Sequence, residues 1–246
     1  MPEETKPGSE SCKHAPPVAK REIDELVERN RNTLQLTPGD LLTGLSIFQI
    51  DQPHQQTLAH LAVAQAREIG SDPGLRSSAI FRATSGGDVA VFTQWTDRST
   101  YDQASQTLLK PSEQELYQVV VVDHITGQCT SQLAIEDGLF HFINVFHLAP
   151  GRRDNFVDYF KRIIPVVRVQ PGFVSTNLLV SLDDCHAANI GQFKSRRDFL
   201  TALRQPRVIM AFAQGFRRRL LYSTLGIIPR SPRLRLYDLL AVFCYK

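Results

Sequence analysis

The feature that most limits how this chain can fold is an internal repeat, in which one pattern returns after 98 residues. The dipeptide Pro73-Gly74 recurs as Pro171-Gly172, and the same offset aligns residues 46–104 with 144–202 without a gap. The alignment holds eight identities, whereas average composition would give roughly three or four by chance. The identities outside the dipeptide are Phe48/Phe146, Ser77/Ser175, Ala90/Ala188, Gln94/Gln192, Arg98/Arg196 and Ala104/Ala202.

The spacing of apolar residues predicts the same order of elements in both copies. Strands are predicted at 42–50, 75–83 and 89–95 in the first copy and at 140–148, 173–182 and 187–193 in the second. A long helix follows the first strand of each copy, and a shorter helix follows the third strand, with Asp97, Asp154 and Ser195 as predicted caps. A last strand ends each copy, at 115–122 and 234–243, where Leu116-Tyr117 matches Leu236-Tyr237 at an offset of 120.

This order of elements predicts an α+β fold. Strand, helix, strand, strand, helix, strand is the ferredoxin-like split βαβ arrangement. Its helices cover one face of the sheet, so the other face needs a cover, which a second copy can supply. We therefore expect two tandem modules, residues 42–125 and 126–246, that form an intramolecular dimeric α+β barrel. Residues 1–20 are expected to be disordered, residues 21–41 to form a helical extension, and residues 204–233 to be an Arg-rich insertion.

The composition excludes several classes of protein. The formal net charge is only +3, which argues against nucleic-acid binding, and no apolar run is long enough to span a membrane. The N-terminus lacks the apolar core of a signal peptide, so we expect a cytoplasmic protein. The four cysteines lie far apart and no segment has metal-ligand spacing, so neither disulfides nor a metal site is expected.

Several segments resemble the antibiotic biosynthesis monooxygenase family. They are DPGLRSSAIFRA and VFTQWTDRSTY in the first copy, and FINVFHLAPGRRDNFVDYF, VQPGFVSTNLLVSLDD and NIGQFKSRRDF in the second. The resemblance covers residues 42–245 and implies the dimeric α+β barrel. The family includes cofactor-free anthrone oxygenases, haem-degrading enzymes, quinol monooxygenases and members without known activity.

The anthrone oxygenases place an Asn four residues before a Trp on the third strand, and a Tyr six residues after that Trp. This set is divided between the copies. The first copy has Trp95 and Tyr101 but Val91 in place of Asn, whereas the second has Asn189 but Phe at both aromatic positions. The resemblance thus implies one pocket between sheet and helices, and the sequence leaves open which copy contains it.

We expect Trp95, Tyr101, Asn189 and His147 to be catalytic, and either His141 or His147 to be a general base for a phenol. Residues expected to bind the substrate are Asn144, Phe146, Phe193 and Phe199. A buried amide must find partners, so the two asparagines contact a ligand or bridge strands. The structural alternatives are a core Trp, a packing Tyr and histidines that face solvent or are satisfied between the sheets.

A narrower resemblance, based on two-copy length and architecture, is to oxygenases that open ring B of angucyclines in pathways to jadomycin, gilvocarcin and kinamycin-type products. It implies oxidation of a dehydrorabelomycin-type quinone, an aromatic polyketide, with reduced flavin supplied by a separate reductase. The flavin, FAD or FMN, would be a diffusible co-substrate. A homodimer of such chains is a further possibility.

The Arg-rich insertion provides candidates for a flavin phosphate site. We expect Arg217, Arg218 and Arg219 to bind it, because the planar guanidinium matches phosphate geometry. The alternative is a solvated helix face or an oligomer contact. Two other functions stay open: a cofactor-free oxygenase of the anthrone type, and a polyketide-binding protein without activity.

Overall fold

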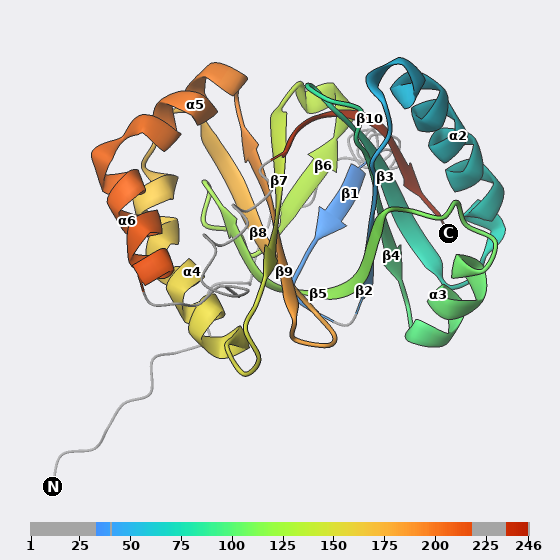
Figure 1. Cartoon of the computed structure of the whole chain (residues 1–246), viewed down its shortest axis with the longest axis horizontal. Coiled ribbons are helices and arrows are strands. Elements are labelled where there is room, and N and C mark those ends of the chain that lie inside the picture. Colours follow the sequence, from blue (N-terminus) through green and yellow to red (C-terminus); the bar gives the residue numbers. More distant parts are fainter. Residues whose placement is uncertain (1–32, 40, 218–234, 246) are drawn as a thin grey trace, which may run out of the picture.

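The computed structural model describes residues 33–39, 41–217 and 235–245. Eight strands form a closed barrel in the order β10-β3-β4-β2-β5-β8-β9-β7, and helices pack on its outside (Figure 1). The barrel strands are β2 (Leu42–Phe48), β3 (Leu75–Ala83), β4 (Val89–Trp95), β5 (Glu113–His124), β7 (Phe140–His147), β8 (Phe173–Ser181), β9 (His186–Phe193) and β10 (Arg235–Cys244). The α-helices of the described residues are α2 (Gln55–Glu68), α3 (Arg98–Ser105), α4 (Arg153–Arg168), α5 (Arg196–Arg204) and α6 (Pro206–Arg217).

The last strand of each half closes the barrel. Strand β5 pairs with β2 of its own half and with β8 of the other, and β10 likewise pairs with β7 and β3. Backbone hydrogen bonds cross between the halves in both directions, from Leu182 N to Leu116 O at 3.0 Å and from Thr84 N to Leu236 O at 2.8 Å. The two predicted sheets are therefore one continuous barrel.

The predicted starts of the short helices are confirmed, but that of the long second-half helix is wrong. The carboxylate of Asp97 accepts a hydrogen bond from Thr100 N at 2.9 Å, and Ser195 Oγ accepts one from Asp198 N at 3.1 Å. Asp154 does not cap α4, because that helix starts at Arg153, two residues earlier than such a cap predicts, with Arg152 at the N-cap. Asp154 lies in the first turn, where the helix dipole stabilises its negative charge.

Strand alternation separates the barrel interior from the face covered by helices. On β4, Ala90 and Phe92 lie in the interior core, whereas Val89 packs in the cluster under α2. The interior core combines residues of both halves, including Ile47, Phe81 and Ile190. Side chains that lie one residue apart on a strand thus enter different environments.

A two-stranded ribbon lies inside the barrel. Strand β1 (Thr33–Leu36) pairs antiparallel with β6 (Ser131–Ala134), and Figure 1 shows both between the two sides of the barrel. Leu34, Leu36 and Leu133 are fully buried in the interior core. The expected helical extension at 21–41 is therefore wrong for residues 33–36, because alternating burial in the barrel favours a strand there. Residues 21–32, and residues 1–20 for which disorder is expected, lie outside the described residues.

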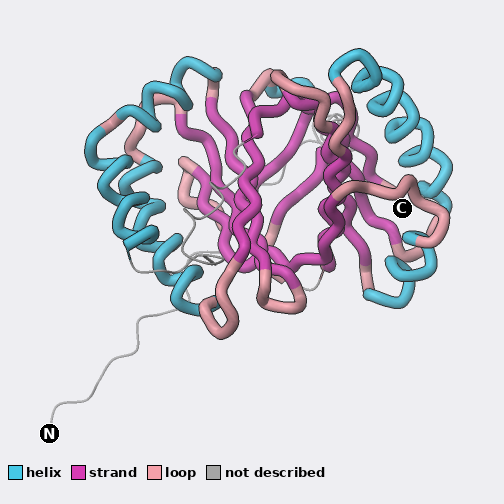
Figure 2. The backbone as a smooth tube through the Cα atoms, viewed as in Figure 1, coloured by secondary structure: helices cyan, strands magenta, loops and turns pink. Residues whose placement is uncertain are grey.

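Helices cover the barrel on two opposite sides (Figure 2). Helices α2 and α3 lie over the first half, and α4, α5 and α6 lie over the second. Helix α6 is the described part of the predicted insertion; Arg217 is its last residue, and Arg218 and Arg219 lie outside the described residues. None of the helices described here is both long and apolar enough to span a membrane.

Candidate functional site

A cavity lies between the second half of the barrel and its three helices. It encloses about 550 Å³ of empty space, part of it open to solvent. Its lining residues are Phe142 and Asn144 from β7; Phe160, Ile163, Ile164 and Val167 from α4; Thr176 from β8; Asn189 and Phe193 from β9; Phe199, Ala202 and Leu203 from α5; and Val208 and Phe212 from α6.

The polar part of this cavity is a cross-strand pair of amides. Asn144 on β7 and Asn189 on β9 are direct partners in the sheet, so both side chains point to the same face. Asn189 Oδ1 accepts a hydrogen bond from Thr176 Oγ1 at 2.7 Å, and both residues line the cavity. Asn144 Oδ1 is buried and has no hydrogen-bond partner within the described chain. The cavity lining is thus apolar except for the two amides and Thr176, and it includes an amide oxygen, Asn144 Oδ1, that is buried without a partner.

Aromatic rings form the other wall of the cavity. Phe142 stacks on Phe199 with ring centroids 4.7 Å apart, and Phe193 lies 5.4 Å from Phe199. This packing depends on Gly191, because a Cβ there would lie 2.2 Å from Cζ of Phe142. The wall suits a planar aromatic ligand, which stacks or meets such rings edge to face.

Helix α6, which has no counterpart in the first half, completes the cavity. Tyr159 of α4 donates its hydroxyl to the carbonyl oxygens of Ala211 at 3.2 Å and Phe212 at 3.1 Å. Burial raises the pKa of Tyr159 to about 12, so the hydroxyl keeps its proton. This bond holds the end of α6 against α4, where Phe212 lines the cavity.

The structure brings four of the predicted site residues together. Asn144, Asn189, Phe193 and Phe199 all line the cavity. Sequence reasoning missed Thr176 and the apolar residues of α4 and α6. Thr176 shares one strand face with Leu178 and Val180, so it was a visible polar position on an apolar face.

Trp95 and Tyr101 lie in the first half and do not contact this cavity. Trp95 is fully buried and meets the ring of Tyr101 edge to face at 5.8 Å. The hydroxyl of Tyr101 accepts a hydrogen bond from Gln114 Nε2 at 2.5 Å. Both residues belong to a packed cluster with Leu42, Leu75 and Ala104. Their expected catalytic roles stay predictions. Their surroundings match the alternative, in which Trp95 is a core residue and Tyr101 a packing residue.

Two further predicted residues lie away from the cavity lining. Phe146 packs against Phe156 of α4, with ring centroids 5.1 Å apart. His147 lies at the exposed end of β7, and its ring meets that of His186 edge to face at 4.8 Å. Strand alternation turns His147 to the face opposite Asn144, so it is not placed to act as a base on a ligand in the cavity.

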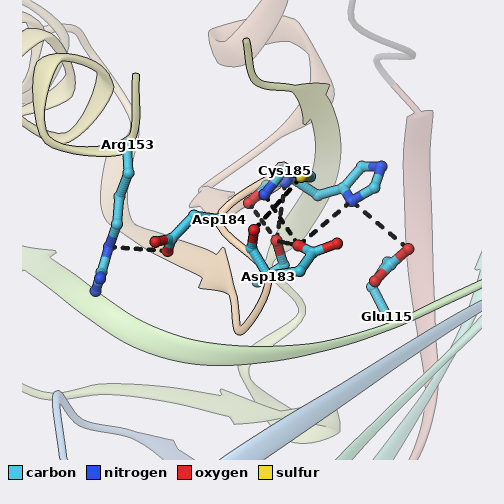
Figure 3. Close-up of polar contacts among 7 residues, drawn as sticks. Glu115, Arg153, Asp183, Asp184 and Cys185 are labelled. Carbon is cyan, nitrogen blue, oxygen red and sulfur yellow. Dashed lines mark hydrogen bonds and ion pairs between the residues drawn. The ribbon is translucent and has the colours of Figure 1, made fainter. Parts of the chain in front are cut away.

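Glu115, Asp183 and Cys185 lie together in a polar cluster (Figure 3), to which His186 also belongs. Its Nδ1 lies 3.5 Å from Glu115 Oε1 and 3.9 Å from Asp183 Oδ1, and the ligand atoms of the three residues lie within 4.8 Å of one another. Asp183 Oδ1 already accepts hydrogen bonds from Ser181 Oγ and Cys185 N. These turn contacts explain its position without a metal ion. Burial raises the pKa of Glu115, partly offset by His186.

Three arginines line a surface groove on the outer side of α5. Arg196, Arg197 and Arg204 are exposed and line it with Leu200 and Thr201. The inner side of the same helix supplies Phe199, Ala202 and Leu203 to the cavity. The described part of the chain thus carries positive charge next to the cavity wall, although none of the residues that line the cavity is charged.

Solved structures share this architecture. An anthrone oxidase-like protein superimposes with a TM-score of 0.72 at 15% identity, over 86% of this chain and 96% of that chain. A proposed monooxygenase from Fusobacterium nucleatum gives a TM-score of 0.58 at 8% identity, over 84% and 95% of the two chains. The chain therefore shares the ferredoxin-like α+β fold of these proteins, closed into an eight-stranded barrel.

One curated protein is related in sequence. Over 71 residues the chain is 32% identical to tetracenomycin-F1 monooxygenase of Streptomyces glaucescens. The match covers 28% of this chain and 63% of that protein, so the chain spans less than two thirds of this relative. No family model matches the sequence.

Proposed function

We propose that this protein is a monooxygenase that oxidises an aromatic polyketide in the cavity of its second half. The observation that carries the proposal is the amide pair Asn144–Asn189 set in an aromatic, uncharged lining. Such a site binds and orients a planar phenol or quinone and excludes water, while the substrate or a cofactor supplies the electrons for oxygen. The related tetracenomycin-F1 monooxygenase supports this substrate class.

We further propose that the chain is two copies of one module with one working cavity. The hydrogen bonds that recur 98 residues apart support this reading. Ser77 Oγ donates to Gln94 Oε1 at 2.5 Å, as Ser175 Oγ donates to Gln192 Oε1 at 2.6 Å. The copies have diverged around the cavity, which accounts for the division of the anthrone-oxygenase residues between them.

The narrower proposal is oxidative opening of ring B in a dehydrorabelomycin-type angucycline, with reduced flavin from a separate reductase. Reduced flavin, when bound, supplies an electron to oxygen. Because the cavity lining is uncharged, a flavin ring system in it would have its phosphate outside. Among the described residues, Arg196, Arg197 and Arg204 would bind that phosphate. The expected phosphate ligands Arg217, Arg218 and Arg219 remain candidates.

The second candidate is a cofactor-free oxygenase of the anthrone type. The uncharged lining favours it, because an electron-rich phenolate substrate can reduce oxygen without a phosphate-bearing cofactor. Asn189 and the unsatisfied oxygen of Asn144 would then orient the substrate.

The test is oxygen consumption with dehydrorabelomycin and with an anthrone, each with and without enzymatically reduced flavin. Uptake with dehydrorabelomycin only in the presence of reduced flavin supports the ring-opening reaction. Uptake without flavin supports the cofactor-free reaction. Turnover that survives unchanged in both Asn144→Ala and Asn189→Ala would contradict the proposed site, and ligand binding without uptake would indicate a binding protein.

A further inference from the structure

The position that a ligand can take in the second half is filled in the first half by a tyrosine of the same chain. The hydroxyl of Tyr245, just after β10, donates to Ala66 O of α2 at 2.6 Å. It also lies 2.8 Å from Ser78 Oγ of β3. Since its one proton is used on Ala66, Ser78 is the donor in the second bond. The phenol thus bridges the helix and the sheet.

The residues around Tyr245 correspond to the lining of the second-half cavity. Ser78 and Ala66 lie 98 residues before Thr176 and Ile164, which both line that cavity. Tyr245 and Ile69 both pack against a cluster that includes Trp95, Tyr101 and Ala104. Their counterparts 98 residues later are all cavity residues: Val167, Phe193, Phe199 and Ala202.

The sequence makes room for the tyrosine in only one half. A Cβ on Gly70 would lie 2.5 Å from Cε1 of Tyr245, so the ring requires glycine there. The residue 98 positions later is Arg168, whose Nη2 bonds Asp123 Oδ1 and His124 O. At the offset of 120 that relates the last strands, Tyr245 corresponds to Ile125, which is exposed. Strand β5, which reaches the second half as β10 reaches the first, therefore supplies no aromatic side chain at this place.

We propose that Tyr245 acts as a built-in phenol ligand, which closes a latent phenol site in the first half and marks where a ligand hydroxyl sits in the open cavity. That position is beside Thr176 Oγ1, within the polar patch formed with Asn144 and Asn189. The inference deepens the proposed function, on which its second part rests, by naming the ligand group and the residue that receives it.

The first test restores the missing ring with a free molecule. Tyr245→Ala removes the plug, and Tyr245→Phe keeps the ring but not the hydroxyl. Phenol should raise the Tm of Tyr245→Ala more than that of the wild type, and toluene should raise it less than phenol. The double variant Tyr245→Ala/Ser78→Ala should lose the advantage of phenol over toluene. An equal rise in Tm with phenol for the wild type, Tyr245→Ala and the double variant would overturn the latent site.

The second test measures binding to the open cavity without oxygen or flavin, so it does not depend on turnover. The probes are 1-naphthol and its methyl ether, 1-methoxynaphthalene. Thr176→Val should weaken 1-naphthol binding about tenfold, the effect of losing one hydrogen bond to a buried group, and leave the ether unchanged. Ser78→Ala, the matched change in the plugged half, should leave both affinities unchanged. Equal losses for both probes would overturn the hydroxyl position, whereas absence of turnover with normal binding would count only against the proposed function.

Discussion

Gln94 and Gln192 bind opposite strands of the same ribbon. Gln94 Nε2 donates to Gln35 O of β1 at 3.0 Å, and Gln192 Nε2 donates to Gln132 O of β6 at 2.8 Å. Gln35 and Gln132 are themselves direct partners in the ribbon. Two residues that the sequence repeat equates therefore hold the centre of the barrel from its two halves.

This arrangement predicts that Gln192→Ala destabilises the protein. The change removes the bond to Gln132 O and leaves the buried Ser175 Oγ without its acceptor, and a buried unsatisfied group costs about 1–3 kcal/mol. The free energy of unfolding from urea denaturation should fall by about that amount or more. Gln103→Ala, at an exposed position on α3, should leave it nearly unchanged. Equal values for the two variants would contradict a role of Gln192 in holding the ribbon.

Filling the cavity should block ligand binding without unfolding the chain. Leu203 is half-buried and lines the cavity from α5, so the larger ring of Leu203→Trp is expected to enter it. The affinity for 1-naphthol should fall about tenfold or more, as 1.4 kcal/mol of lost contact would give. The matched change is Ser105→Trp in the first half, where the affinity should not change. Isothermal titration with both variants checks this, and equal losses would place the ligand elsewhere.

The buried His141 predicts a pH dependence of stability. Burial lowers its pKa to about 4, and its Nε2 lies 3.2 Å from the donor amide of Gln192, which suits only a neutral ring nitrogen. The unfolded chain therefore binds a proton below about pH 6.5 that the folded chain does not bind until about pH 4. Stability is complete above pH 6.5 and is lost as the pH falls through this window.

Between pH 6.5 and pH 5 the loss from His141 should be about 2 kcal/mol, at about 1.4 kcal/mol per pH unit. Urea denaturation at the two pH values measures it. His141→Asn removes the titrating group and should show a smaller difference between the two values, whatever its own stability. Parallel losses in wild type and variant would assign the acid sensitivity to other groups.

Gly191 is predicted to be required by the ring of Phe142. In Gly191→Ala the new Cβ would overlap Cζ of Phe142, so the ring must shift and the unfolding free energy should fall by about 1–3 kcal/mol. Phe142→Leu shortens the side chain and should relieve part of this loss in the double variant. A double-mutant cycle measured by denaturation checks the coupling. Strict additivity would mean that the two residues do not compete for this space.

Much of the fold could be predicted from the chain alone. The strand 75–83 and the strand 89–95 have the predicted bounds, because apolar alternation and the turns on either side of them are local signals. The capping of Asp97 and Ser195 is equally local. Alternation along each strand also indicates which residues share a face with Asn144 on its strand and with Asn189 on its strand.

Only the tertiary structure decided what those faces meet. The sequence repeat made the halves look equivalent. In the first half the space between helices and sheet is filled by Tyr245, whereas in the second half it is a cavity that Phe212 of α6 lines. His147 and Asn144 are three residues apart on one strand but lie on opposite faces, so only Asn144 reaches the cavity. The sequence by itself determined the order of elements and the pairing of equivalent positions, because these follow from local periodicity. The location of the cavity depends on contacts between residues far apart in the chain, which local periodicity does not encode.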